Sequence, residues 1–169
     1  MTEGLSCTCM MSLIWRPASF DEHARQGMMH EAALLLAALN QMESAHDLES
    51  GGTENRRLER VEAKLDLALH LLSRALEPGQ PPAARTVQLT PQWVEWEDAL
   101  GPDAGTRVIL ELRPSEHLPL TLRLPGVAVA AAPGWARVGL EHLSEMLDDT
   151  LHQFVFRRHR QAIRSRAGG

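Results

Sequence analysis

Apolar positions across residues 20–77 recur every three or four residues, which is the period of an α-helix. The pattern predicts a helix over residues 21–45, with Asp21 and Glu22 at its start, where the helix dipole favours acidic side chains. Residues 32–39 are apolar on every side of this helix, so it is expected to have several neighbours. Gly51-Gly52 interrupts the pattern, and a second helix is predicted over residues 54–77.

The second predicted helix carries a heptad repeat. Its apolar residues fall at position a (Leu58, Leu65 and Leu72), position d (Val61, Ala68 and Ala75) and position e (Leu69 and Leu76). Three heptads support a coiled coil, and the wide stripe with small alanines at d suits an assembly of three or four helices. This face could instead pack only on the first helix of its own chain. The helix is about 36 Å long and precedes the β-strand region that follows it in the chain. Both features favour self-association, and a homotetramer is the expected state.

Residues 85–141 alternate between apolar and polar positions with a period of two, as β-strands do. The expected strands cover residues 87–89, 92–97, 107–112, 118–124, 127–132 and 135–140, with proline and glycine between them. Six short strands predict a small antiparallel barrel. Ser144 is expected to cap a last helix, whose apolar face contains Leu147 and Leu151. The predicted fold class is therefore α+β, with a six-stranded barrel, a C-terminal helix and an N-terminal helical extension.

The first 19 residues show no strong pattern and are expected to form a flexible leader. They contain both cysteines, Cys7 and Cys9, but no second cysteine pair and no histidine cluster, so no metal site is predicted. No basic segment precedes the mildly apolar residues 5–15, which argues against a signal peptide and for a cytoplasmic location. The predicted domains are a leader over residues 1–19, an oligomerisation region over 20–77 and a barrel with its helix over 83–166.

Composition excludes several classes of function. The chain has 169 residues, 44% of them hydrophobic, enough for one domain with a real core. Its net charge of -5 argues against a nucleic-acid partner, and no apolar run is long enough to cross a membrane. The motifs H-E-x-x-H, G-x-S-x-G and G-x-x-x-x-G-K-[ST] are all missing from the sequence. Neither enzymatic activity nor a cofactor is predicted.

A basic cluster ends the chain, formed by Arg157, Arg158, Arg160, Arg164 and Arg166. It has three interpretations. It could bind phosphate, dock a protein partner, or simply complement the dipole at the end of a helix.

Three segments of the β region and the last helix resemble the PilZ domain family, small bacterial barrels that typically bind cyclic di-GMP. They are RTVQLTPQWVEWE over residues 85–97, Leu124-Pro125-Gly126 before a valine-rich strand, and ARVGLEHLSEMLDDTLHQFVFRR over residues 136–158. The preceding heptad helix is similar to that of atypical PilZ-like proteins, in which an added long helix drives tetramer formation. The resemblance implies a role in signalling without catalysis.

The ligand-binding motifs of that family are incomplete in this chain. The family uses R-x-x-x-R ahead of the first strand, where only Arg85 is present here. Its D/N-x-S-x-x-G turn aligns with residues 88–93, so that Gln88 replaces the acid, Thr90 the serine and Trp93 the glycine. The missing guanidinium would have gripped phosphate and stacked on guanine, and an indole fills space that glycine leaves open. Cyclic di-GMP is therefore not expected to bind.

Two functions follow from the resemblance. The first is an oligomeric adaptor that acts through an unidentified protein partner in motility, pilus or virulence control. The alternative is a receptor for cyclic di-GMP or another nucleotide, gripped by Arg85 and the C-terminal arginines. A nucleic-acid regulator acting through residues 157–166 is the least supported.

Overall fold

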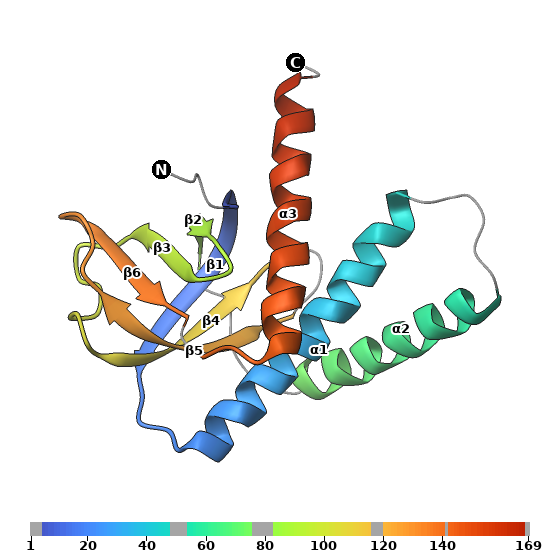
Figure 1. Ribbon diagram of the computed structural model, residues 1–169, viewed down its shortest axis with the longest axis horizontal. Helices are drawn as coiled ribbons and strands as arrows, with labels where there is room; N and C mark the ends of the chain where they lie inside the picture. The colour runs from blue at the N-terminus through green and yellow to red at the C-terminus, as the bar shows by residue number, and fades with distance from the viewer. Residues whose placement is uncertain (1–4, 48–53, 76–82, 116–119, 141, 168–169) are drawn as a thin grey trace.

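The computed structural model describes residues 5–47, 54–75, 83–115, 120–140 and 142–167 (Figure 1). The elements in chain order are β1 (Cys7–Pro17), α1 (Glu22–Asp47), α2 (Glu54–Ala75), β2 (Ala84–Leu89), β3 (Trp93–Glu97), β4 (Arg107–Arg113), β5 (Leu122–Val129), β6 (Trp135–Gly139) and α3 (Glu145–Ala167). The predicted fold class, α+β with a six-stranded barrel, a C-terminal helix and an N-terminal helical region, is confirmed.

The six strands form a closed antiparallel barrel in the order β1-β2-β3-β6-β5-β4. Strand β1 closes it, because Cys7–Ser12 pair with β2 and Ser12–Pro17 pair with β4. The side chains of Trp96, Leu110 and Leu124 are fully buried. Each of the six strands therefore pairs with a neighbour on both sides.

Strand β1 corrects the prediction of a flexible leader over residues 1–19. Its buried side chains, including Cys7, Met11 and Leu13, alternate imperfectly with exposed ones. Met10 is apolar but points outward, and Ser12 is polar but buried. Met10 and Ile14 are apolar at positions where the alternation requires polar residues, so the period of two is weak in the sequence and does not reveal the strand.

Strand β5 corrects a second expectation, that residues 118–124 and 127–132 form separate strands. Residues 122–129 form one continuous strand through Pro125-Gly126, while residues 118 and 119 lie outside the described part of the chain. A Cβ atom at Gly126 would lie 2.4 Å from Val138 Cγ1, so glycine lets β5 approach β6 closely. The number of strands is six, as predicted, because β1 adds one strand to the predicted set and β5 replaces two predicted strands by one.

Helices α1 and α3 pack against the barrel, and α2 packs on α1 away from the strands (Figure 1). Helix α1 contacts α3, β5 and α2, which confirms that its apolar surface has several neighbours. The predicted cap of α3 is present, since Leu147 N–H donates to Ser144 Oγ over 3.3 Å. The C-terminal half of α3 extends well beyond the barrel (Figure 1).

Candidate functional site

The turn between β2 and β3 is built around Thr90. The backbone N–H groups of Trp93 and Gln92 donate to Thr90 Oγ1 over 2.9 and 3.2 Å, and Thr90 N–H donates to the carbonyl of Trp93 over 3.0 Å. The hydroxyl of Thr90 is thereby committed to holding the turn. This turn places Trp93 at the start of β3, where it lines a groove together with His152 and His159 of α3.

A groove of about 1070 Å³ lies between the barrel and α3. Its walls include Gln88, Thr90 and Trp93 from the β2–β3 hairpin, Arg137 from β6, and His152 from α3. The structure therefore brings together three of the four positions that the sequence singled out.

Within this groove Arg137 is already paired. Its Nη2 lies 2.8 Å from Glu95 Oε1, and its Nε donates to the same oxygen over 3.0 Å. The guanidinium carbon lies 4.7 Å from the centroid of the Trp93 ring, a cation–π contact. Glu95 is 9% exposed. Arg137 therefore covers the Trp93 ring and offers the groove little uncompensated positive charge.

Arg85, the fourth predicted position, is not among the residues that line the groove. Its Nη1 lies 3.7 Å from Asp98 Oδ2. Burial opposes the ionisation of Asp98, but hydrogen bonds from Trp96 Nε1, the N–H of Leu100 and Trp15 Nε1, together with Arg85, outweigh it and lower the pKa of Asp98. Arg85 thus belongs to a separate polar cluster.

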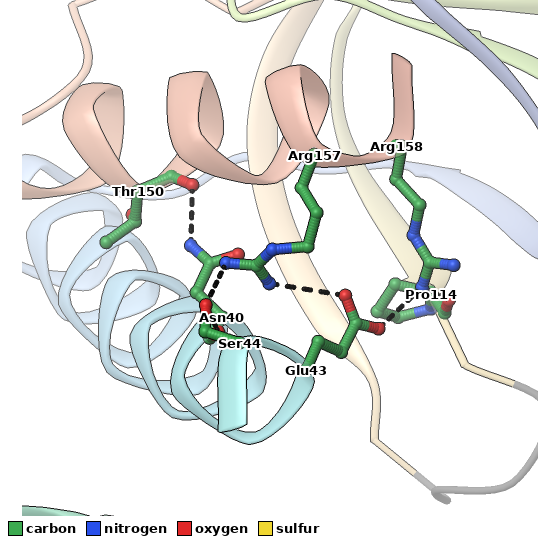
Figure 2. A network of polar contacts seen from close by, with 7 residues as sticks. All are labelled: Asn40, Glu43, Ser44, Pro114, Thr150, Arg157 and Arg158. Carbon is green, nitrogen blue, oxygen red and sulfur yellow. Dashed lines mark hydrogen bonds and ion pairs between the residues drawn. The ribbon is translucent and has the colours of Figure 1, made fainter. Parts of the chain in front are cut away.

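The first two arginines of the basic cluster tie α3 to the end of α1, as Figure 2 shows. Arg157 Nη1 and Arg158 Nη2 lie 3.3 and 2.9 Å from the two carboxylate oxygens of Glu43. Arg157 also donates to Ser44 Oγ over 2.9 Å, and Arg158 to the carbonyl of Pro114 over 3.0 Å. These contacts hold the two helices together. The guanidinium groups of Arg157 and Arg158 are therefore already paired with groups of their own chain.

The heptad face of α2 is exposed. The side chains of Val61, Leu65, Leu69 and Leu72 are 59%, 58%, 58% and 65% exposed, and Ala68 is exposed beside them. Helix α2 packs on α1 through a different stripe, which contains the buried Leu67 and the half-buried Leu71. The side chain of Leu58 and all of Leu76 lie outside the described part of the chain. The heptad face is therefore not used to pack α2 on α1.

The cysteines Cys7 and Cys9 are free thiols of β1. The hydrogen bond between the two thiols raises the pKa of Cys7 and lowers the pKa of Cys9. Burial raises the pKa of Cys7 further. Among the described residues, no group of three or more His, Cys, Asp or Glu side chains is placed to hold a metal ion. In the same part of the chain, no helix is long and apolar enough to span a membrane.

Comparison with known proteins assigns most of the chain to a family. The model of the atypical PilZ domain, described as a cyclic di-GMP receptor, matches residues 33–167. This chain belongs to the atypical PilZ domain family. The resemblance inferred from residues 85–158 is thereby confirmed.

A crystal structure of a pathogenic protein from Xanthomonas campestris is similar to this PilZ protein. The two chains are 28% identical, with a TM-score of 0.70 over 96% of this chain and 92% of the other. That structure is described as a tetrameric PilZ domain self-assembled via an unusual helical bundle. No curated protein matched the chain.

Sequence reasoning missed the pair that dominates the groove of this PilZ domain. Glu95 and Arg137 are 42 residues apart but face each other in the register of β3 and β6. The sequence does show opposite charges on two predicted strands. It does not show that these strands are neighbours, and the order of strands in the barrel was needed to recognise the pair.

Proposed function

We propose that this PilZ protein is a non-enzymatic signalling adaptor that assembles into a homotetramer through α2 and does not bind cyclic di-GMP. The observation that carries the proposal is the heptad face of α2. Four large apolar side chains, Val61, Leu65, Leu69 and Leu72, are more than half exposed on one chain. A stripe of this kind on a monomer marks an interaction site.

A second copy of the chain is the occupant that best fits the heptad face. Burying a leucine or valine side chain completely contributes about 1.5–3 kcal/mol relative to full exposure, so covering four half-exposed ones supplies a substantial part of an interface. The heptad spacing is the pattern by which helices pack together in bundles. The relative from Xanthomonas campestris self-assembles via a helical bundle, which supports the same use of the helices here.

The groove argues against binding of cyclic di-GMP. To grip a phosphate with the edge formed by its Nε and Nη2, Arg137 would have to leave Glu95, and that buried carboxylate would lose its partner. To stack on Trp93, a base would have to displace the guanidinium from the ring. Arg85 lies outside the groove, where Asp98 holds it. The two charged phosphates of this ligand would thus meet no uncommitted arginine in the groove.

The adaptor role itself rests on the family. The family is described as a cyclic di-GMP receptor, which supports a role in signalling, and the relative is described as a pathogenic protein. We propose that the tetramer acts in the cytoplasm through contacts with a protein partner, in motility, pilus or virulence control.

The second candidate is a nucleotide receptor, which the description of the family favours. The groove of about 1070 Å³ is large enough for such a ligand. The gripping residues expected from the sequence, Arg85 and the C-terminal arginines, would contribute only if Arg85 left Asp98 and if Arg157 and Arg158 left Glu43.

Calorimetric titration of the intact protein with cyclic di-GMP separates these candidates. We expect no saturable heat with a Kd below about 10 µM, which corresponds to roughly -7 kcal/mol. A saturable signal in that range would overturn the proposal. If that signal vanished in Arg137→Ala and survived in Arg85→Ala, the ligand would be seated in the groove.

A further inference from the structure

The C-terminal half of α3 presents a face that neither the barrel nor α1 covers. Phe156 and Ile163 are 51% and 54% exposed, although both are large and apolar. They are seven residues apart, so they lie on one side of the helix, and Arg160 and Arg164 flank them. We call these four residues the α3 tip surface. It borders a groove of about 460 Å³ that Phe156, Arg160 and Arg164 help to line.

The α3 tip surface carries positive charge without an internal partner. In the parts of the chain that the structure describes, no carboxylate forms an ion pair with Arg160 or Arg164, in contrast to Arg157 and Arg158. The guanidinium carbon of Arg160 lies 5.6 Å from the centroid of the Phe156 ring. No Asp or Glu occurs after Asp149 in the sequence, although the whole chain has a net charge of -5. The chain is therefore acidic overall but basic at this end.

We propose that the α3 tip surface docks an acidic amphipathic helix of a partner protein. This proposal rests on the adaptor function and names the chemistry of its partner. Apolar side chains one heptad apart on the partner helix would cover Phe156 and Ile163, and glutamates beside them would pair with Arg160 and Arg164. Complementary charges at the rim of such an interface speed association and select the partner.

Other occupants fit this surface less well. Two copies packed symmetrically through it would bring arginine against arginine. The affinity of a protein for nucleic acid rises with the number of phosphates that it neutralises. Two arginines without a carboxylate partner, on a chain that is acidic overall, give little attraction. The alternation of apolar and basic positions on one helical face instead matches a helix with the opposite charge.

The test uses the intact protein and a labelled synthetic helix with leucine at heptad positions a and d and glutamate at e and g. Fluorescence anisotropy is expected to show saturable binding that weakens as salt is raised. Replacing the glutamates of the probe by lysine should abolish binding. Arg160→Glu and Phe156→Ala should each weaken binding at least ten-fold. Arg107→Glu, which makes the same charge change at an exposed position on β4, should leave binding within two-fold.

Equal binding of the acidic and basic probes, or unchanged binding in Arg160→Glu, would overturn the proposal. Duplex DNA or anionic phosphatidylglycerol vesicles that bind through Arg160 as tightly as the acidic helix would overturn it too, because the surface would then be a general anion site. Failure of this test in a protein that is tetrameric and does not bind cyclic di-GMP would refute only the docking surface. Binding of cyclic di-GMP would refute the adaptor function instead.

Discussion

At the scale of single residues, three side chains in the groove, Trp93, Glu95 and Arg137, bind to one another. Glu95 is buried, Arg137 neutralises it, and the Trp93 ring packs against the guanidinium. The sequence identified Trp93 as a position where glycine is expected in the family. Its partner Arg137 could not be identified, because it lies on β6, which is distant in the sequence and pairs with β3 only in the folded barrel.

Removing Arg137 should destabilise the barrel more than removing an exposed arginine. Arg137→Ala leaves the carboxylate of Glu95 buried without its partner, and because Arg137 is partly exposed we expect a loss of about 1–3 kcal/mol in the free energy of unfolding. Urea unfolding followed by tryptophan fluorescence measures it. Arg107→Ala is the control and should change stability by less than about 0.5 kcal/mol. Equal effects of the two variants would show that the pair does not stabilise the fold.

Asp98 should make stability depend on pH in the acid range. Its pKa in the folded state is below the ordinary value of about 3.9, because the hydrogen bonds and Arg85 outweigh burial. Such a carboxyl stabilises the fold above the pKa of the unfolded state, and this contribution is lost as the pH falls towards the folded pKa. The stability difference between wild type and Asp98→Asn should therefore shrink between about pH 6 and pH 2.5 in urea unfolding. A difference that stays constant over this range would contradict the assignment.

At the scale of elements, the sequence predicted the helices better than the strands. Helix α2 was found because its heptad repeat is regular, and α3 because Ser144 caps it. Strand β1 was missed because the apolar residues Met10 and Ile14 interrupt its alternation. Its place is decided by pairing with β2 and β4, which lie far away in the sequence. Strand β5 was divided in two because Pro125-Gly126 usually marks a turn, whereas here it allows a close approach to β6.

The two stripes of α2 should respond differently to substitution. Leu65→Asp places a carboxylate on the exposed heptad face, where assembly would bury it unpaired, so we expect dissociation to monomers with an unchanged circular dichroism spectrum. Leu67→Ala removes a side chain that is 3% exposed between α2 and α1. It should lower the free energy of unfolding by about 2–4 kcal/mol without a direct effect on the interface. An assembly that survives Leu65→Asp would exclude the heptad face as the interface.

At the scale of the whole molecule, the chain combines a closed barrel with two exposed helical surfaces. The barrel groove holds a neutralised arginine, the heptad face of α2 is apolar, and the α3 tip surface is basic and apolar. This distribution favours protein contacts over a small ligand. The sequence predicted the heptad face, while it could not show that α2 packs on α1 through Leu67 and leaves that face uncovered.

The mass of the intact protein in solution tests the central claim most directly. One chain has a mass of 18.7 kDa, so assembly through α2 into a tetramer predicts about 75 kDa, four times that value. Multi-angle light scattering at tens of micromolar chain concentration measures this mass without assumptions about shape. We expect a single species near 75 kDa, whereas a species near 18.7 kDa at the same concentration would contradict the account.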